Sequence, residues 1–578
     1  MSARKLTKGF VAVAVFGLWL RGPAIMAAAG HAAQAAGTGQ QPQGLEDILH
    51  YIASGWSSLT RSMTSCASVA DPKAPEKSVL YLPAAFALPE AVEQMEKNCT
   101  VRVEHLPAVI GRLGQIDGSK IHPPGLLYLQ NPYVVPGGRF NEMYGWDSYF
   151  IIRGLLEDGR LDLARDMVEN FFFEIDHYGG LLNANRTYYL TRSQPPFLTS
   201  MIMAVDEAAQ RSGETSQARL AWLATAYGYA VKDYNLWIHR PHLAGDTGLS
   251  RYYDFGDGPV PEMADDPVFY HRVVSYLLTH PDPRWPYLLR SDVGGSAATL
   301  MGPVFDLDLC DAGVAGSNGE SNRNCDPVER LSLTPDYYKG DRSMRESGFD
   351  VAFRFGPYSG STHHYAPVCL NSLLYKVERD LEQMSARLGH EQESKQWGER
   401  ASHRQELVNK YFWDQKRGLY FDYDFERGKE SSYIFLTTFY PLWTGLASPE
   451  QARAVMGNAK LFEQPGGLAM STGKSGGQWD YPYGWAPTQL IAVEGLRRYG
   501  DTNDANRVSY NFLSMVLDNF RRDGTIREKY NVGTRSSETN VAAGYEQNVI
   551  GFGWTNAAFL VFLHELPKSM ASRLGATN

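Results

Sequence analysis

Residues 371–412 read NSLLYKVERDLEQMSARLGHEQESKQWGERASHRQELVNKYF and contain two apolar stripes at helical spacing. The first stripe comprises Leu373, Val377, Leu381, Met384 and Leu388, and the second comprises Trp397, Ala401, Val408 and Phe412. Gly389 follows the first stripe, where a helix usually has its C-terminal cap, and a short polar link leads to the second. We therefore predict two helices that pack antiparallel as a hairpin.

The same helical period recurs along most of the chain. Further stripes occur at 161–175, 220–234, 485–499, 505–520 and 553–566, whereas strand-like alternation is limited to short pieces such as 419–424. Long irregular stretches alternate with these helices, and loops of such length are usually functional; they span 176–197, 240–265, 300–362 and 522–552. Because no sharp change in composition follows residue 45, we predict one all-α domain over 45–567 and a C-terminal tail over 568–578.

The composition places the chain among well-packed globular proteins. Of its 578 residues, 43% are hydrophobic and 12% are aromatic, which excludes a disordered chain, a collagen and a coiled coil. The formal net charge is −9, and no basic run follows the N-terminus. We therefore expect no nucleic-acid partner, because such binders neutralise phosphates with clustered Lys and Arg.

The N-terminus predicts export. Arg4, Lys5 and Lys8 precede an apolar run at 10–20, and small residues continue to Ala36, as in a secretory signal peptide. We assign residues 1–36 to this leader and the Gly/Gln-rich residues 37–44 to a flexible tether. The alternative is a membrane anchor, but the apolar run is too short to span a bilayer. We expect a periplasmic or secreted protein without stable membrane insertion after removal of the leader.

Five cysteines fit an oxidising compartment, and the odd number leaves at least one without an intramolecular partner. Cys310 and Cys325 bracket a Gly/Ser/Asn-rich loop, so we expect these two to pair. Cys66 with Cys99 is a second candidate. No CxxC motif or His/Cys cluster has the spacing of metal ligands, so no metal is expected.

The densest group of functional side chains lies at 136–150, which reads PGGRFNEMYGWDSYF. A pyranose presents hydroxyls that charged side chains bind and C–H faces that stack on an indole. Trp146, next to Asp147 and close to Arg139, meets both needs. Taken alone, the stretch is also compatible with a capped helix start surrounded by buried aromatic side chains.

This stretch resembles the first signature of the trehalases, PGGRFxExYxWDxY, at every specified position. Residues 478–487, QWDYPYGWAP, likewise match the second signature, QWDxPxGWxP. The resemblance includes 183–197, 346–350, 527–530 and 551–556, and it covers most of the chain from about residue 125. It implies an (α/α)6 toroid, in which two concentric rings of helices carry a sugar pocket at one end. The predicted helical pairs agree with this architecture.

The resemblance further implies hydrolysis of α,α-trehalose with inversion, which needs an acid for the bridging oxygen and a base for the attacking water. Asp350 occupies the position of the general acid, among apolar neighbours that favour a protonated carboxyl. Glu528 occupies the position of the general base, between basic neighbours that favour an ionised carboxylate. The two carboxyls should then lie ~6.5 to 9.5 Å apart. The implied partner is a small neutral disaccharide, and we expect a monomer without a cofactor.

By the same resemblance, a set of further positions should bind the substrate: Arg139, Trp146, Asp147, Asn183, Arg192, Ser193, Gln194, Glu262, Gly348 and Glu546. For Arg139 and Arg192 the alternative is a structural ion pair with an acidic neighbour.

The chain also departs from the family pattern. Val260 replaces the arginine of an Arg-Pro-Glu motif, Phe349 replaces the tryptophan before the acid, and Tyr483 replaces an asparagine of the second signature. Glu546 aligns only with a one-residue shift. These changes leave open another short α-glucoside as the substrate. A phosphorylase is disfavoured because it needs no base at Glu528, and a non-catalytic sugar binder because it needs no protonatable carboxyl at Asp350.

Overall fold

The computed structural model describes residues 44–71, 78–263, 267–290, 302–307 and 329–575. The predicted leader, the tether before Gly44, and both Cys310 and Cys325 lie outside the described residues.

Six helices form a closed inner ring. Each contacts the next in the order α4, α6, α10, α12, α14, α16, and α16 packs against α4 again. Their bounds are α4 Gly145–Glu157, α6 Leu198–Arg211, α10 Val368–Arg387, α12 Tyr440–Thr444, α14 Ala486–Arg498 and α16 Gly553–Glu565. Most residues of α4, α14 and α16 are buried, as expected for helices that are covered on all sides.

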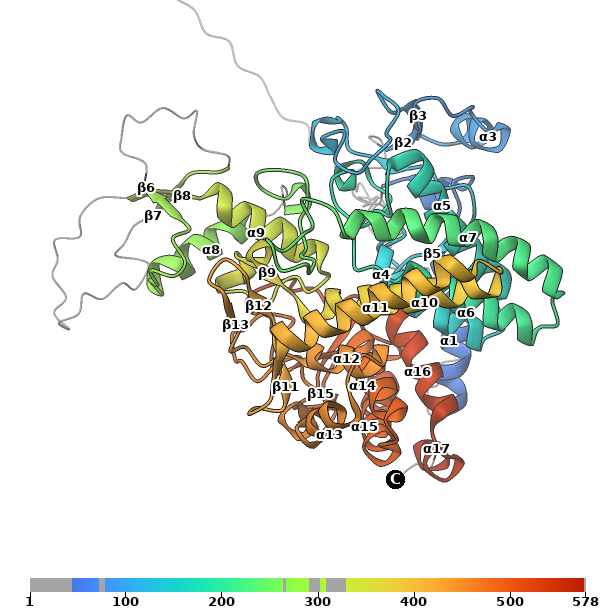
Figure 1. The fold of residues 1–578 in the computed structure, drawn as a ribbon. Helices are drawn as coiled ribbons and strands as arrows, with labels where there is room; N and C mark the ends of the chain where they lie inside the picture. The colour runs from blue at the N-terminus through green and yellow to red at the C-terminus, as the bar shows by residue number, and fades with distance from the viewer. Residues whose placement is uncertain (1–43, 72–77, 264–266, 291–301, 308–328, 576–578) are drawn as a thin grey trace, which may run out of the picture. The chain divides into compact units, whose positions relative to one another are not determined.

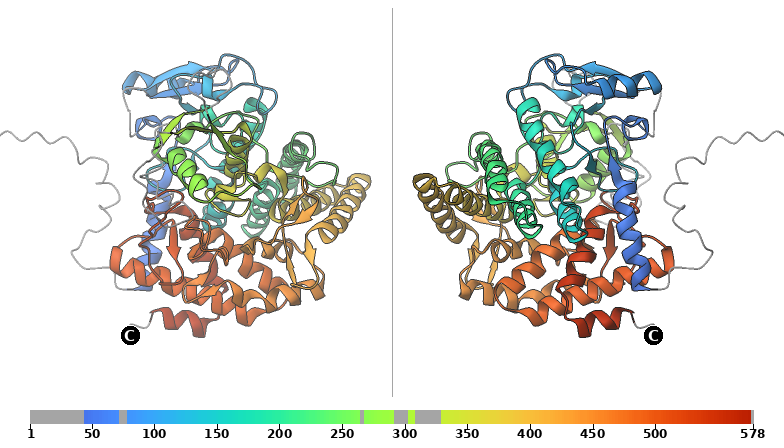
Figure 2. Two further views of the ribbon diagram at one scale, coloured as in Figure 1. Left: turned by 90° about the vertical axis from the view of Figure 1, so that its left-hand side faces the viewer. Right: turned by 90° about the vertical axis from the view of Figure 1, so that its right-hand side faces the viewer.

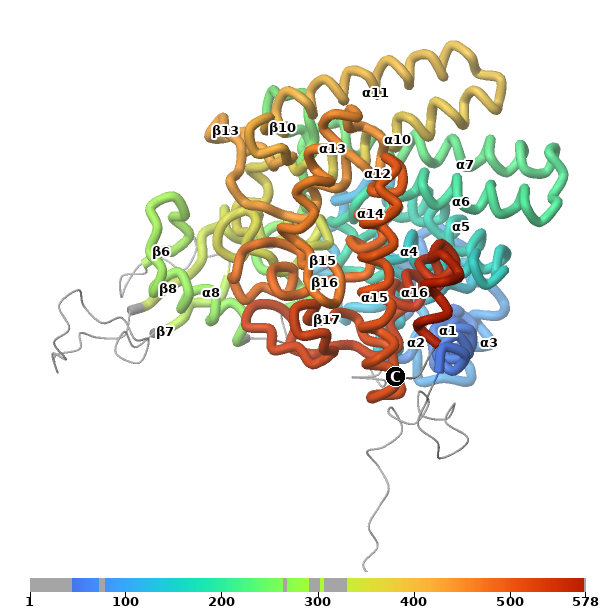
Figure 3. The backbone as a smooth tube through the Cα atoms, turned by 90° about the horizontal axis from the view of Figure 1, so that it is seen from below, coloured from blue at the N-terminus to red at the C-terminus, as the bar shows by residue number. Residues whose placement is uncertain are grey.

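A second set of helices packs outside this ring. It comprises α1 Leu45–Leu59, α5 Leu161–Tyr178, α7 Ser216–Trp237, α11 Glu391–Phe412, α13 Pro449–Gly457 and α15 Thr502–Asp523. Outer helices lie against neighbouring inner ones: α5 contacts α4 and α6, α7 contacts α6 and α10, and α15 contacts α14 and α16. Figure 1 and Figure 3 show the outer helices beside their inner partners. The predicted (α/α)6 toroid is confirmed.

The hairpin predicted at 371–412 is formed by α10 and α11. Gly389 adopts a left-handed conformation with φ of +80°, which ends α10 without the strain that a side chain would cause. The His390 N–H donates to the Ser385 carbonyl at 2.8 Å, which completes the cap. Arg404 of α11 forms an ion pair with Glu378 of α10 at 2.7 Å, and both side chains are buried. The two stripes therefore pack as predicted.

The remaining helices and strands of the described residues lie in the connections between ring helices, except α17, which follows α16. The helices are α2 Cys66–Val69, α3 Glu90–Asn98, α8 Pro267–Thr279, α9 Pro335–Glu346 and α17 Lys568–Gly575. The strands are β1 Thr60–Arg61, β2 Val79–Leu82, β3 Arg102–His105, β4 Leu126–Leu127, β5 Tyr133–Val134, β6 Leu288–Arg290, β7 Phe305–Leu307, β8 Glu329–Leu333, β9 Tyr365–Ala366, β10 Trp413–Asp414, β11 Leu419–Tyr420, β12 Tyr423–Asp424, β13 Lys429–Glu430, β14 Glu463–Gln464, β15 Gly467–Leu468, β16 Tyr483–Trp485 and β17 Lys529–Asn531.

Two of the small sheets join segments that are distant in the sequence. The β3-β2-β4 sheet is parallel and comes from the N-terminal region, coloured blue in Figure 2. The antiparallel pair β16 and β17 aligns Tyr483 with Asn531 and Trp485 with Lys529. This pairing joins the second signature motif to the segment that contains Glu528.

Three findings refine the sequence predictions. The segment 568–575, predicted as a tail, forms α17, which contacts α15 and buries Leu574. Cys66 and Cys99 form a disulfide, so the second candidate pairing is the one seen among the described residues, and Cys369 is a buried free thiol. In the part of the chain that the structure describes, no helix is both long and apolar enough to cross a bilayer.

Candidate active site

One cavity of about 510 Å³ contains both predicted carboxyls, Asp350 and Glu528, in its wall. All the predicted binding residues except Ser193 and Glu546 line the same cavity: Arg139, Trp146, Asp147, Asn183, Arg192, Gln194, Glu262 and Gly348. The structure thus brings together residues that lie up to several hundred positions apart in the sequence.

These residues converge because of how the chain passes through the rings. Asp147 begins α4, Arg192 lies shortly before α6, Trp485 directly precedes α14, and Trp554 begins α16. The inner helices alternate with outer return helices, so they all run in the same direction and their N-terminal ends meet at one end of the ring. The irregular stretches predicted to carry the chemistry are the connections at this end.

Asp350 follows α9, and its carboxyl lies next to a guanidinium and a phenol hydroxyl. The Arg345 guanidinium lies 3.7 Å from its Oδ2, and the Tyr545 hydroxyl forms a hydrogen bond with its carboxyl. Burial outweighs both of these stabilising contacts and raises the pKa of Asp350 to about 6. The direction agrees with the protonated form that an acid catalyst needs.

Glu528 has a different environment, although it lines the same cavity. Its Oε2 accepts a hydrogen bond from Lys529 Nζ at 2.9 Å, so the carboxylate is held in an ion pair with a fully buried ammonium. Its backbone carbonyl accepts from the Trp554 indole N–H at 3.0 Å. The indole contact and the β17 pairing hold the backbone on both sides of the carboxylate.

Asp147 is the third carboxyl in the cavity wall and lies in the first turn of α4. Burial is the main reason that its pKa is raised well above the usual value, and the charges of Glu528 and Asp350 raise it further. Asp147 is therefore close enough to both acids to interact electrostatically with each.

Several buried polar atoms in the cavity wall have no hydrogen-bond partner among the described residues. They are Nε and Nη1 of Arg192, Nη2 of Arg345 and Oε2 of Glu262. Arg192 Nη2 forms an ion pair with Glu262 Oε1, which holds both side chains in place. The other guanidinium nitrogens of Arg192 and the second carboxylate oxygen of Glu262 form no hydrogen bond within the described part of the chain. Leaving such buried polar atoms unpaired costs free energy.

Aromatic rings form the remainder of the wall. Trp479 stacks on Trp485 with ring centroids 3.9 Å apart, and Trp146 and Trp554 contact Trp479 at 5.8 and 6.3 Å. Gly348 has a φ of +76°, and a Cβ at this position would lie 2.8 Å from the Trp146 ring. Glycine is therefore required for this approach.

Two predicted binding residues occupy other places. Ser193 is buried outside the cavity wall, where its hydroxyl donates to the Leu181 carbonyl at 2.7 Å. The Glu546 side chain is 71% exposed and forms an ion pair with Arg272 at 2.9 Å. Each is next in the sequence to a residue that lines the cavity, Gln194 for Ser193 and Tyr545 for Glu546. The two side chains of each pair point in different directions.

The sequence analysis missed Tyr545 and Arg345. The Tyr545 hydroxyl accepts a hydrogen bond from Arg345 Nη1 at 2.7 Å, and both residues line the cavity. Arg345 stands one position before the 346–350 motif, so extending that motif would have included it. Tyr545 stands one position before Glu546, and no local signal distinguishes it.

Tyr545→Phe should move the alkaline limb of the kcat/KM profile to higher pH. The phenol stabilises ionised Asp350, so its loss raises the pKa of Asp350, and the acid keeps its proton further into the alkaline range. We expect a shift of roughly 0.5 to 1 pH unit. Tyr234→Phe is the matched control, because the Tyr234 hydroxyl of α7 also donates to a buried carboxylate, Glu378 of α10, which is not part of the cavity wall. Equal profiles for wild type and Tyr545→Phe would contradict the contact.

A half-buried carboxyl with a raised pKa and a second carboxylate in an ion pair lie in one cavity of polar and indole groups, an arrangement that suits a glycosidase. The family model described as Trehalase matches residues 59–292 and 317–567. The chain belongs to the trehalase family.

Individual relatives agree with this assignment. The chain is 35% identical to the cytosolic neutral trehalase of Saccharomyces cerevisiae over 90% of its own length and 72% of the relative. It is also 35% identical to the cytosolic neutral trehalase of Neurospora crassa, over 87% of this chain and 68% of the relative. The solved structure of the neutral trehalase Nth1 from S. cerevisiae superposes with a TM-score of 0.72, at 33% identity, over 92% of this chain and 96% of that chain.

The predicted export is wrong by this comparison, because these relatives are named cytosolic. The prediction depended on the charge and hydropathy of residues 1–36 alone. Those residues lie before the matched region, which begins at residue 59.

Proposed function

We propose that the chain hydrolyses α,α-trehalose to two glucose molecules with inversion. The observation that carries this proposal is one cavity whose wall contains both carboxyls together with Arg192, Arg345, Glu262 and four tryptophans. The hydroxyls of a disaccharide bind to charged side chains, and its C–H faces stack on indole rings. The cavity volume of about 510 Å³ lies within the range of small-molecule sites.

In the proposed reaction, Asp350 is the general acid and Glu528 the general base. Protonated Asp350 donates to the bridging oxygen as the glycosidic bond breaks. Glu528 removes a proton from the water that attacks the anomeric carbon from the opposite face. Lys529 holds the Glu528 carboxylate in place through their ion pair at 2.9 Å, and Arg345 and Tyr545 stabilise the charge that Asp350 acquires.

The departures from the family pattern do not change the described cavity wall. Val260, Phe349 and Tyr483 are buried, and none of the three is among its lining residues. Arg345 supplies a guanidinium near Glu262, with Nε 4.0 Å from Glu262 Oε1, where the Val260-Pro261-Glu262 motif has no arginine. Relatives that are named trehalases support trehalose over another short α-glucoside as the substrate.

The test is to incubate the enzyme with trehalose and a panel of α-linked disaccharides and to follow the anomeric protons by NMR. Inversion of trehalose releases one β-glucose from the attacked ring and one α-glucose as the leaving group. We therefore expect equal amounts of both anomers before mutarotation, and the highest kcat/KM for trehalose.

Release of α-glucose alone would contradict inversion, and a higher kcat/KM for another disaccharide would contradict the substrate. The reaction is also run with and without inorganic phosphate. A turnover that requires phosphate, with glucose 1-phosphate as a product, would identify a phosphorylase instead.

A further inference from the structure

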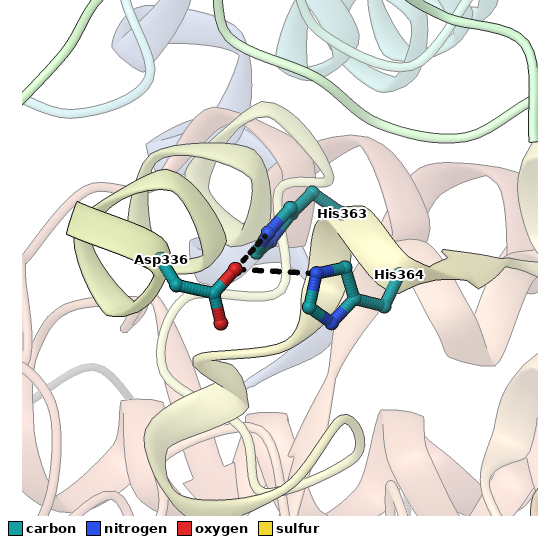
Figure 4. Close-up of side chains that lie close together, drawn as sticks. All are labelled: Asp336, His363 and His364. Carbon is teal, nitrogen blue, oxygen red and sulfur yellow. Dashed lines mark hydrogen bonds and ion pairs between the residues drawn. The ribbon is translucent and has the colours of Figure 1, made fainter. Parts of the chain in front are cut away.

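Away from the active-site cavity, two imidazoles converge on one carboxylate oxygen. Nε2 of His363 lies 3.0 Å and Nε2 of His364 lies 3.2 Å from Asp336 Oδ1. Figure 4 shows each of the two imidazole rings directing a nitrogen toward this oxygen. The Asp336 side chain that carries the oxygen extends from a helix. Among the described residues, these three side chains form the one group of at least three His, Cys, Asp or Glu residues whose ligand atoms all lie within 4.8 Å of one another.

The spacing of these atoms is that of ligands around a small divalent ion. Zinc binds imidazole nitrogen and carboxylate oxygen at about 2.0 to 2.2 Å. In a tetrahedral site, the ligand atoms then lie about 3.3 to 3.5 Å apart. The two observed O···N separations are a few tenths of an ångström shorter, so a slight outward movement of Asp336 makes room for the ion.

The site also provides access and a place for a fourth ligand. A cavity of about 400 Å³ is lined by Asp336, His364 and Glu426, together with Arg284 and Arg427. The Asp336 side chain is 49% exposed and that of His364 is 24% exposed, so a hydrated ion can reach them. Water can complete the coordination from this cavity.

The positive charges beside this cavity are already paired. Arg427 Nη1 bonds to Asp424 at 2.8 Å, and Arg284 Nη2 bonds to Asp282 at 2.5 Å. Both guanidiniums are therefore largely neutralised by carboxylates of their own, which reduces their repulsion of a cation.

We propose that Asp336, His363 and His364 bind a divalent transition-metal ion, with zinc as the best match to two imidazoles and one carboxylate. No sequence pattern indicated this site, because Asp336 lies 27 positions before His363 and no ligand spacing is recognisable. The inference does not depend on the identity of the sugar substrate.

The position of the site defines its role. Asp336 lies in the first turn of α9, and Arg345 lies in the last turn, about 14 Å along the helix axis. Asp350 follows α9, and the chain then returns to the start of the same helix at His363 and His364. A metal ion at this point closes the loop that carries the general acid, and it acts as a structural brace at a distance from the sugar.

The experiment uses the full chain, stripped with EDTA and dialysed. Zn²⁺ binding is followed by calorimetry, and Co²⁺ binding is followed by its visible absorption, which reports a low-symmetry site. We expect one equivalent bound at micromolar affinity or tighter. Saturating Zn²⁺ should raise Tm by about 2 to 5 °C.

Two ligand variants locate the binding, because a buried change at His363 could prevent folding. His364→Ala and Asp336→Asn should each weaken Zn²⁺ binding at least tenfold and reduce the rise in Tm by at least about half at the same Zn²⁺ concentration. His403→Ala is the matched control, since His403 is a surface imidazole that lies 3.7 Å from Glu406, and it should bind as the wild type does.

Two outcomes would overturn the proposal. One is a wild-type chain that binds no Zn²⁺ or Co²⁺ at 100 μM, a concentration about a hundred times the expected Kd. The other is binding that both ligand variants retain unchanged, which would place the ion elsewhere, for example at cysteine thiols.

Discussion

Asp350→Asn and Glu528→Gln are each expected to lower kcat for trehalose by about 10²- to 10⁴-fold, the usual contribution of a general acid or base. Both changes keep the shape of the side chain and remove its ability to exchange a proton. Asp350 is buried beside Arg345 and Tyr545, and its amide can still accept from both, so the fold should persist. The measurement is steady-state hydrolysis of trehalose, with Tm as the check of folding.

The pH dependence separates the two roles. Wild-type kcat/KM should fall as the pH rises through about 6, because Asp350 then loses the proton that it must donate. In Asp350→Asn this alkaline limb should disappear from the residual activity, whereas Glu528→Gln should retain it because Asp350 is still present. Glu399→Gln, a change of an exposed carboxylate, is the control. Residual rates within tenfold of the wild type would remove either residue from the mechanism.

Arg345→Gln should lower kcat/KM by roughly 10- to 100-fold, which corresponds to the loss of a charge-assisted hydrogen bond. The guanidinium lies next to Asp350 and Glu262, and it also contacts Asp341 at 3.3 Å. Its loss leaves these buried carboxylates short of a partner, so the free energy of unfolding should also fall, by about 3 to 5 kcal/mol.

A second buried ion pair distinguishes catalysis from stability. Arg404 pairs with Glu378 between α10 and α11, and its side chain is 7% exposed, compared with 3% for Arg345. Arg404→Gln should therefore lose comparable stability but keep its kcat/KM below the unfolding transition. If both variants show the same kcat/KM relative to wild type, Arg345 has only a structural role. Arg345→Lys tests whether a charge without the guanidinium fork is enough.

The outer helices α5, α11 and α15 were accessible to sequence analysis because each has one face in water. That exposure produces their stripes, and the stripe spacing led directly to the α10–α11 hairpin. The inner helices α10, α14 and α16 were predicted as well, but the inner helix α4 was not. In α4, every residue from Trp146 to Ile152 is buried, so no polar face marks the period.

Residues 300–362 were predicted to be irregular, but residues 335–346 form the helix α9. This helix buries charged side chains, including Asp341, Arg342 and Arg345, which are compensated by one another and by Asp254. Hydropathy therefore shows no apolar stripe, although the helix is buried. The Cys66–Cys99 disulfide, one of the two candidate pairs, forms where α2 contacts α3.

The sequence alone determined the helical class of the fold and the family, because the stripes and the signature motifs each depend on residues that are near one another in the chain; the same motifs predict the two carboxyls. Only the tertiary structure decided which neighbours enter the cavity. Tyr545 contacts Asp350 while Glu546 faces solvent, and Gln194 lines the wall while Ser193 does not. Adjacent side chains point in different directions, and that direction is set by packing against segments hundreds of residues away, which a local pattern does not encode.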